Sequence, residues 1–186
     1  EWNIIESGYA DVNGLFALSP WLLMLLCAAL TMRLFAEERQ TGMWELLRTM
    51  PVSLTRIVVD KFLAAWSITA LAILPCAVHL WAVYRMAEPV GNVDVACFVG
   101  SMTGLLLLAA VFTALGMVAS CWSKSQIVSF ICSATLSFVL YWAVIQDHFR
   151  SISRGVIDLR DIGFFLLLMV LSLSLTTLLL YQLTRR

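Results

Sequence analysis

Few residues in the apolar stretches of this sequence could perform acid–base or nucleophilic chemistry. His79 is the only ionisable residue within the apolar cores, and a serine could use it as a base. Such a pair would indicate an intramembrane serine protease, but neither a G-x-S-x-G context nor an oxyanion-hole signature occurs. The candidate nucleophiles are Ser101, Ser129, Ser133 and Ser137. We keep the protease as a weak alternative and expect no catalytic residue.

Metal and nucleotide chemistry are also poorly represented. The five cysteines show no C-x-x-C spacing, so they predict neither a metal site nor a disulfide framework. The phosphate-binding pattern G-x-x-x-x-G-K-[ST] does not occur. Ion-coupled transporters usually keep Asp, Glu, Lys or Arg at mid-membrane, and the apolar cores contain none. If this protein moves a solute, we expect the energy to come from another protein.

The composition indicates an integral membrane protein. Hydrophobic residues make up 61% of the 186 residues, charged residues only 13%, and the mean hydropathy is +0.91. Twelve basic residues balance twelve acidic ones, so the net charge gives no reason to expect nucleic acid as a partner. Membrane lipid is the expected surrounding.

Five stretches are long enough, or nearly so, to cross a bilayer as helices, which takes about 20 apolar residues. They are apolar nearly all round, unlike a core helix of a water-soluble protein. Pro75 interrupts the second stretch. The predicted fold is therefore an all-α, polytopic membrane helix bundle forming a single domain over residues 1–186. The predicted spans are residues 15–35, 62–84, 97–122, 127–145 and 162–183.

The basic residues predict the orientation of this bundle. Eight of them fall on one side and four on the other, and the richer side should be cytoplasmic. This places residues 36–61 and the C-terminus inside and residues 147–161 outside. The cytoplasmic set is Arg33, Arg39, Arg48, Arg56, Lys61, Lys124, Arg185 and Arg186.

Residues 37–53 form a charged, helix-forming island between two apolar runs. Thr41 could cap a short helix that begins near Gly42, and Pro51 should end it. The apolar residues at helical spacing are Met43, Leu46, Leu47 and Met50. Acidic and basic residues are mixed here, whereas anionic lipid would favour an excess of basic ones. This favours docking in a protein groove over a helix that lies on the lipid headgroups, which stays an alternative.

Small residues recur at helical spacing within the predicted spans. We expect them to pack helices closely, although a dimer interface, a cavity wall or a path for an amphipathic substrate stays open. The packing residues are Gly100, Gly104, Gly116, Ser129, Ser133 and Ser137. On the outer side, residues 147–161 place Phe149, Ile152, Val156 and Leu159 at helical steps and predict an amphipathic helix at, or dipping into, the membrane surface.

Several of these motifs together resemble ABC-2 type exporter permeases, in particular the gliding-motility permease subfamily. The matching runs begin with Leu34-Phe35-Ala36-Glu37-Glu38, Thr41-Gly42, Glu45-Leu46-Leu47 and Pro51-Val52-Ser53. Further matches are Lys61-Phe62, Gln126-Ile127-Val128 and Ser153-Arg154-Gly155-Val156-Ile157-Asp158. The resemblance covers nearly the whole chain. Members of that family begin with an amphipathic helix and a further span, so we take the complete protein to have six spans and this chain to lack the first.

The resemblance implies a permease subunit in the cytoplasmic (inner) membrane of a bacterium. Its partners would be a cytoplasmic ABC ATPase, which binds the ATP, and a second permease subunit, so the chain itself needs no cofactor. It would couple hydrolysis by the ATPase to substrate translocation, or act as a non-transporting anchor or mechanical transducer. The outer loop would form a gate-like element. The ATPase-contacting residues carried over are Glu37, Glu38, Thr41, Gly42, Glu45, Leu46, Leu47 and Pro51.

Overall fold

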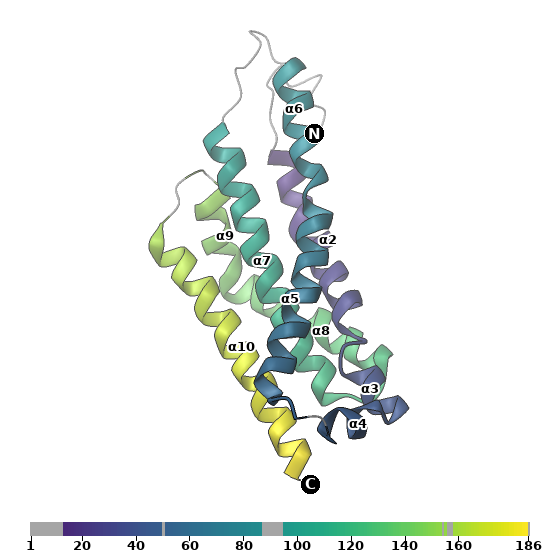
Figure 1. The fold of residues 1–186 in the computed structure, drawn as a ribbon. Coiled ribbons are helices and arrows are strands. Elements are labelled where there is room, and N and C mark those ends of the chain that lie inside the picture. Colours follow the sequence, from purple (N-terminus) through teal and green to yellow (C-terminus); the bar gives the residue numbers. More distant parts are fainter. Residues whose placement is uncertain (1–12, 50, 87–94, 154, 156–157, 186) are drawn as a thin grey trace.

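The computed structural model describes residues 13–49, 51–86, 95–153, 155 and 158–185, and within these ranges it contains helices and no strands (Figure 1). The predicted all-α fold is therefore confirmed. In chain order the elements are α2 (Asn13–Thr31), α3 (Ala36–Thr41), α4 (Met43–Thr49), α5 (Leu54–Ile73), α6 (Pro75–Met86), α7 (Val95–Trp122), α8 (Gln126–Leu140), the π-helix η1 (Tyr141–Ile145), α9 (Gln146–Ser153) and α10 (Leu159–Arg185).

Four helical segments of the described residues are long and apolar enough to cross a membrane: Phe16–Thr41, Ala96–Trp122, Gln126–Ser153 and Leu159–Thr184. They correspond to four of the five predicted spans. The remaining prediction, residues 62–84, is divided at Leu74 between α5 and α6. Pro75 explains the break because it lacks the N–H that would continue the helix. In Figure 1, α6 continues the direction of α5 along the bundle, so a fifth crossing stays a prediction.

The helices alternate in direction along the bundle (Figure 1). α2, α7 and α10 run one way, whereas α5 with α6, and α8 with η1 and α9, run the other way. As a result, α3, α4, the α7–α8 turn and the C-terminal end of α10 gather at one end, and α6, α9 and the start of α7 lie toward the other. The described parts of the two predicted loops therefore lie toward opposite ends of the bundle.

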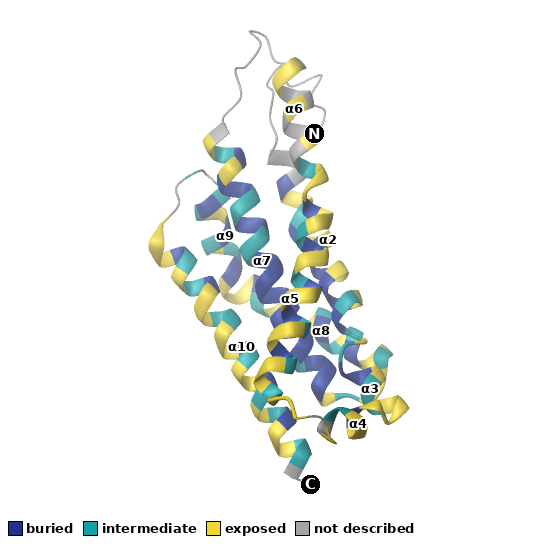
Figure 2. Cartoon of the chain, viewed as in Figure 1, coloured by how far each residue is buried: buried dark blue, intermediate teal, exposed yellow. Residues whose placement is uncertain are grey.

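α7 is the central helix. It packs against α2, α5, α8, α9 and α10, and Figure 2 shows it mostly buried while the outer helices expose one face. In the apolar window of α7, 83% of the residues are buried, against 17% in that of α10. A helix surrounded on all sides has no polar face to present, which explains why α7 is apolar all round.

The amphipathic segment predicted for residues 147–161 differs from expectation. α9 is not a separate surface helix but continues α8 through the π-helical turn η1, and it ends at Ser153. Phe149 and Ile152 are buried in the same hydrophobic cluster as residues of α7. Leu159 is 85% exposed at the start of α10, and Val156 lies outside the described residues. Burial against α7 removes more apolar surface than an interfacial position would, which explains the difference.

Candidate functional site

The chain changes direction between α2 and α3, where residues 32–35 form a turn. The first N–H groups of a helix have no partner within the helix and must find one elsewhere. Here the Ser120 Oγ of α7 accepts hydrogen bonds from the N–H groups of Phe35 (3.1 Å) and Ala36 (3.2 Å). The same hydroxyl lies within hydrogen-bond distance of the Met32 carbonyl oxygen (3.3 Å). Ser120 thus caps α3 from a different helix.

Two cations hold α3 against the bundle. Arg39 donates a hydrogen bond from Nη1 to the carbonyl oxygen of Cys121, in the last turn of α7. Carbonyl groups there lack partners within the helix and carry negative partial charge, so a guanidinium stabilises them. From α5, the Lys61 ammonium pairs with the Glu38 carboxylate and donates to the Leu34 carbonyl oxygen. It also lies 4.4 Å from the ring centroid of Phe35.

Gly42 separates α3 from α4. Its φ of 75° lies in the left-handed region, which favours glycine and ends α3. Thr41 was expected to cap the following helix, but its hydroxyl donates to the Glu37 carbonyl oxygen (2.9 Å) within α3. That prediction is wrong because α3 includes Thr41. α4 ends at Thr49, two residues before Pro51, in agreement with the expected stop.

α4 presents one face to the bundle and the other to solvent. Trp44 is buried, with its ring edge toward Phe35 (centroids 6.3 Å apart, planes at 78°), and Leu47 packs beside the same cluster. Met43 and Leu46 are 52% and 58% exposed. Of the predicted apolar seam, Met43 and Leu46 are therefore exposed, Leu47 packs against the bundle instead, and Met50 lies outside the described residues. Trp44 takes the buried position because it removes the largest apolar area from water.

Most of the predicted ATPase contacts lie on an exposed surface, which we call the α3–α4 face. It is formed by Glu37, Thr41, Gly42, Met43, Glu45 and Leu46. Pro51 is exposed just beyond α4. Glu38 and Leu47 do not belong to this face: the Glu38 side chain is 23% exposed in its pair with Lys61, and Leu47 is half-buried. These two side chains are placed to hold the helices in position.

Two of the glycines predicted to pack helices allow α9 to approach α7. A Cβ atom on Gly100 would lie 2.4 Å from the carbonyl oxygen of Ile152, and one on Gly104 would lie 3.2 Å from the Phe149 ring. Gly116 marks another crossing, because a Cβ there would lie 2.1 Å from the Thr31 Oγ1. Gly100 and Gly116 have no room for a side chain, whereas a Cβ on Gly104 would require a small shift of the Phe149 ring.

The predicted serine stripe of α8 faces the bundle interior. Ser129, Ser133 and Ser137 are all buried. A Cβ on Gly116 would lie 2.9 Å from the Ser133 Oγ, so α2, α7 and α8 meet here. Among the described residues, the hydroxyls of Ser129 and Ser133 have no hydrogen-bond partner. The stripe therefore lies at a helix–helix contact.

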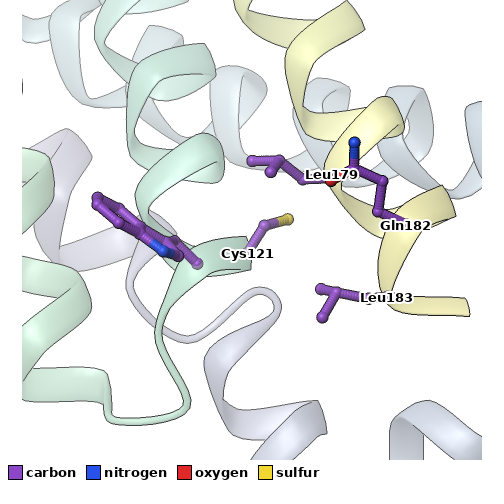
Figure 3. Close-up of a pocket in the computed structure, with 5 residues that line it drawn as sticks. Cys121, Leu179, Gln182 and Leu183 are labelled. Atoms are coloured by element: carbon purple, nitrogen blue, oxygen red, sulfur yellow. The ribbon is translucent and has the colours of Figure 1, made fainter. Parts of the chain in front are cut away.

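Ser101, one candidate nucleophile of the protease alternative, lies at the contact between α7 and α9. Ser101 donates its hydroxyl to the Ser153 carbonyl oxygen (3.2 Å), and the side chain of His79 lies outside the described part. A search of the described residues finds no group of three or more His, Cys, Asp or Glu side chains that could hold a metal ion. A shallow pocket of about 200 Å³ lies between α7 and α10 (Figure 3). Its mainly apolar lining is Cys121, Trp122, Leu179, Gln182 and Leu183.

Fold and site together define a multi-pass α-helical membrane protein with two short helices clamped to one end of its bundle. The sequence matches the family model described as ABC-2 family transporter protein over residues 9–181, nearly the whole chain. The chain belongs to this family and is a permease component of an ABC transporter. Membership implies a partner ATPase in general, since such membrane subunits are normally not the ATPase themselves. Neither a curated protein nor a solved structure matches the chain.

Proposed function

We propose that this chain is the membrane subunit of an ATP-driven exporter and that its α3–α4 face is the docking site of a cytoplasmic ATPase. The ATPase binds and hydrolyses ATP, and the chain itself carries no cofactor. A second permease subunit, identical or different, completes the membrane part. The resemblance stated above narrows the proposal to a gliding-motility permease-like subunit of a bacterial cytoplasmic membrane.

The observation that carries this proposal is the chemistry of the α3–α4 face. Met43 and Leu46 expose apolar surface beside two exposed carboxylates, Glu37 and Glu45. The cation of α3, Arg39, is turned toward α7. Exposed carboxylates give anionic lipid headgroups no attraction here, whereas a protein groove with apolar walls and basic edges would bury the exposed apolar area. The face therefore suits a protein partner better than lipid.

A first test replaces both apolar residues of the face with acids, as Met43→Asp with Leu46→Asp. Losing two apolar contacts should weaken ATPase binding at least about tenfold, since together they contribute more than about 1.4 kcal/mol. The measurement is the amount of Walker-type ATPase, identified by mass spectrometry, that co-purifies with the tagged chain. Leu159→Asp is the control, because it places an acid at an exposed leucine toward the opposite end of the bundle. Undiminished co-purification in the double variant would reject the docking site.

A second test addresses the side of the membrane. A single cysteine at position 45, in a chain freed of its native cysteines, should resist a membrane-impermeant maleimide in intact cells and react after permeabilisation. A cysteine at position 159 should behave in the opposite way. Labelling of position 45 in intact cells would contradict the proposal, because an ATP-hydrolysing partner works in the cytoplasm.

The non-transporting anchor or mechanical transducer would use the same docking face. The two functions differ in their ATP turnover. An exporter hydrolyses ATP faster when its substrate is present in the vesicle system, whereas an anchor binds the ATPase without such stimulation.

A further inference from the structure

We infer that α3 delivers its movement to α7 rather than to α2, and that Ser120, Arg39 and Lys61 are the positioning residues of this connection. The inference rests on the proposed function, because it concerns how motion of a docked ATPase enters the bundle. The contacts between α3, α5 and α7 support it, and sequence spacing indicates none of them.

The covalent link from α2 to α3 is a turn and not a continuous helix. Two helix-type bonds remain at this link, from Met32 N–H to the Ala28 carbonyl oxygen (3.0 Å) and from Glu37 N–H to the Arg33 carbonyl oxygen (3.3 Å), while Leu34 donates three residues back to Thr31 (3.1 Å). Residues 32–35 lie outside both helices, and the N–H groups of Phe35 and Ala36 bond to Ser120 instead of to the preceding turn. Because fewer backbone hydrogen bonds oppose a change at a turn than within a helix, the contacts of α3 with other helices contribute to its orientation.

α3 contacts both α7 and α8, and its hydrogen bonds to α7 converge on two consecutive residues at the end of that helix. Ser120 holds the N–H groups of Phe35 and Ala36 through its hydroxyl, which is itself buried. The Cys121 carbonyl oxygen accepts a hydrogen bond from the Arg39 guanidinium. Because one contact lies at the start of α3 and the other one turn later, α3 cannot rotate against α7 without losing at least one of them.

α5 holds the same segment through the cation of Lys61, beside Val58 and Phe62, which share a hydrophobic cluster with Phe35. Lys61 contacts the carboxylate of Glu38, the carbonyl oxygen of Leu34 and the face of the Phe35 ring. We call Ser120, Arg39 and Lys61 the clamp. Phe35 is fully buried and touches Trp44 of α4, so α4 is joined to the clamp as well. The clamp thus connects the exposed α3–α4 face to the interior through polar contacts on one side and aromatic contacts on the other.

α7 is suited to distribute the movement. It is one helix of 28 residues, about 42 Å long at 1.5 Å per residue, and it packs against α2, α5, α8, α9 and α10. At the far end, the Gly100 backbone is in close contact with Ile152 and Gly155. A displacement of the Ser120 end therefore reaches α9 through one rigid element.

The test measures whether nucleotide still changes the distance between α7 and α10, at the end of the bundle that holds α9, when the clamp is weakened. Spin labels on Val99→Cys of α7 and Leu159→Cys of α10, both exposed sites in a chain freed of its native cysteines, report this movement by pulsed electron paramagnetic resonance. The sample is the membrane complex with its co-purified ATPase, without nucleotide and with ATP plus vanadate. We expect a nucleotide-dependent change in distance in the otherwise unmodified chain and its loss in the Ser120→Ala, Arg39→Gln variant, with ATPase binding unchanged.

Ser172→Ala is the matched control, because it removes a buried hydroxyl that bonds only to its own helix at Leu168. It should retain the full distance change, as should the conservative variants Ser120→Thr and Arg39→Lys in large part. Reversing the Lys61 pair, as Lys61→Glu with Glu38→Lys, should restore more of the change than either single reversal. If the double variant fails to assemble, the same series is measured with the single substitutions, each of which should reduce the change.

Two failures are distinguishable. If the ATPase remains bound and the Ser120→Ala, Arg39→Gln variant moves as the unmodified chain does, the clamp is not the path and this inference is wrong, while the docking site stands. If the ATPase stays bound after Met43→Asp with Leu46→Asp, the docking site itself is wrong.

Discussion

The two ends of the bundle are held together by different kinds of contact. At the α3–α4 end, side chains of Arg39, Lys61 and Ser120 reach backbone or carboxylate groups on other segments. At the α9 end, helices meet backbone to backbone at Gly100 and Gly155. Polar side chains tie α3 to α5 and α7 at several points, so these segments should move together. The close contacts at Gly100 and Gly155, which we call the glycine seam, instead fix the distance between α7 and the end of α9.

The glycine seam is reinforced by hydrogen bonds to a single carbonyl group. The Ser153 carbonyl oxygen accepts from the Cys97 thiol (2.9 Å) and the Ser101 hydroxyl (3.2 Å) of α7. α9 is also linked to α10, where the His148 Nδ1 lies 2.7 Å from the Asp161 Oδ1 and the imidazole stacks on Phe164. This end therefore joins three helices, α7 to α9 through closely spaced backbones and α9 to α10 through side chains.

The largest effect should come from Gly100→Ala in the seam. The added Cβ would lie 2.4 Å from the Ile152 carbonyl oxygen, and since that atom is backbone the helices must separate. We expect a loss of about 3 kcal/mol in the free energy of unfolding, the upper range for overpacking, measured by denaturant titration in detergent micelles. Gly163→Ala in α10 is the control, because its Cβ would meet no atom within 4 Å. Equal stability of the two variants would contradict the fixed seam.

Lys61→Met should have the next largest effect. It leaves the Glu38 carboxylate, 23% exposed, without its cation, and we expect a loss of about 2 kcal/mol, less than for a fully buried pair. The same titration applies. Arg56→Met is the control, since the Arg56–Asp60 pair is 76% and 66% exposed and should contribute less than about 0.5 kcal/mol. Similar losses from both substitutions would show that the clamp is no stronger than a surface ion pair.

Gly42→Ala should have the smallest effect. A Cβ at this position meets no atom within 4 Å, so only the backbone conformation at φ 75° opposes it, at a cost of about 1 kcal/mol. Gly42→Asn should cost less, because asparagine tolerates the left-handed region better than alanine does. A loss as large as that of Gly100→Ala would mean that the α3–α4 end is as tightly packed as the seam, and the contrast between the ends would disappear.

Local sequence signals predicted the elements better than they predicted the contacts. The length of the apolar runs was sufficient for four spans, and the stop before Pro51 followed from the steric effect of proline on the preceding residues. The choice of Trp44 over Met43 for burial could have been found by comparing their apolar areas. The cap from Ser120 had no local signal, because that hydroxyl lies 85 residues from Phe35 in the chain.

The sequence by itself determined that this chain is a bundle of membrane helices with one charged island, because transfer of apolar residues into lipid and the chemistry of Gly and Pro act locally. Only the tertiary structure decided which members of the island face outward. Glu38 and Glu37 are neighbours of the same type, yet one pairs with Lys61 of α5 and the other is exposed. The distance between an acid and a distant cation depends on how whole helices pack, and spacing along one segment contains no information on that.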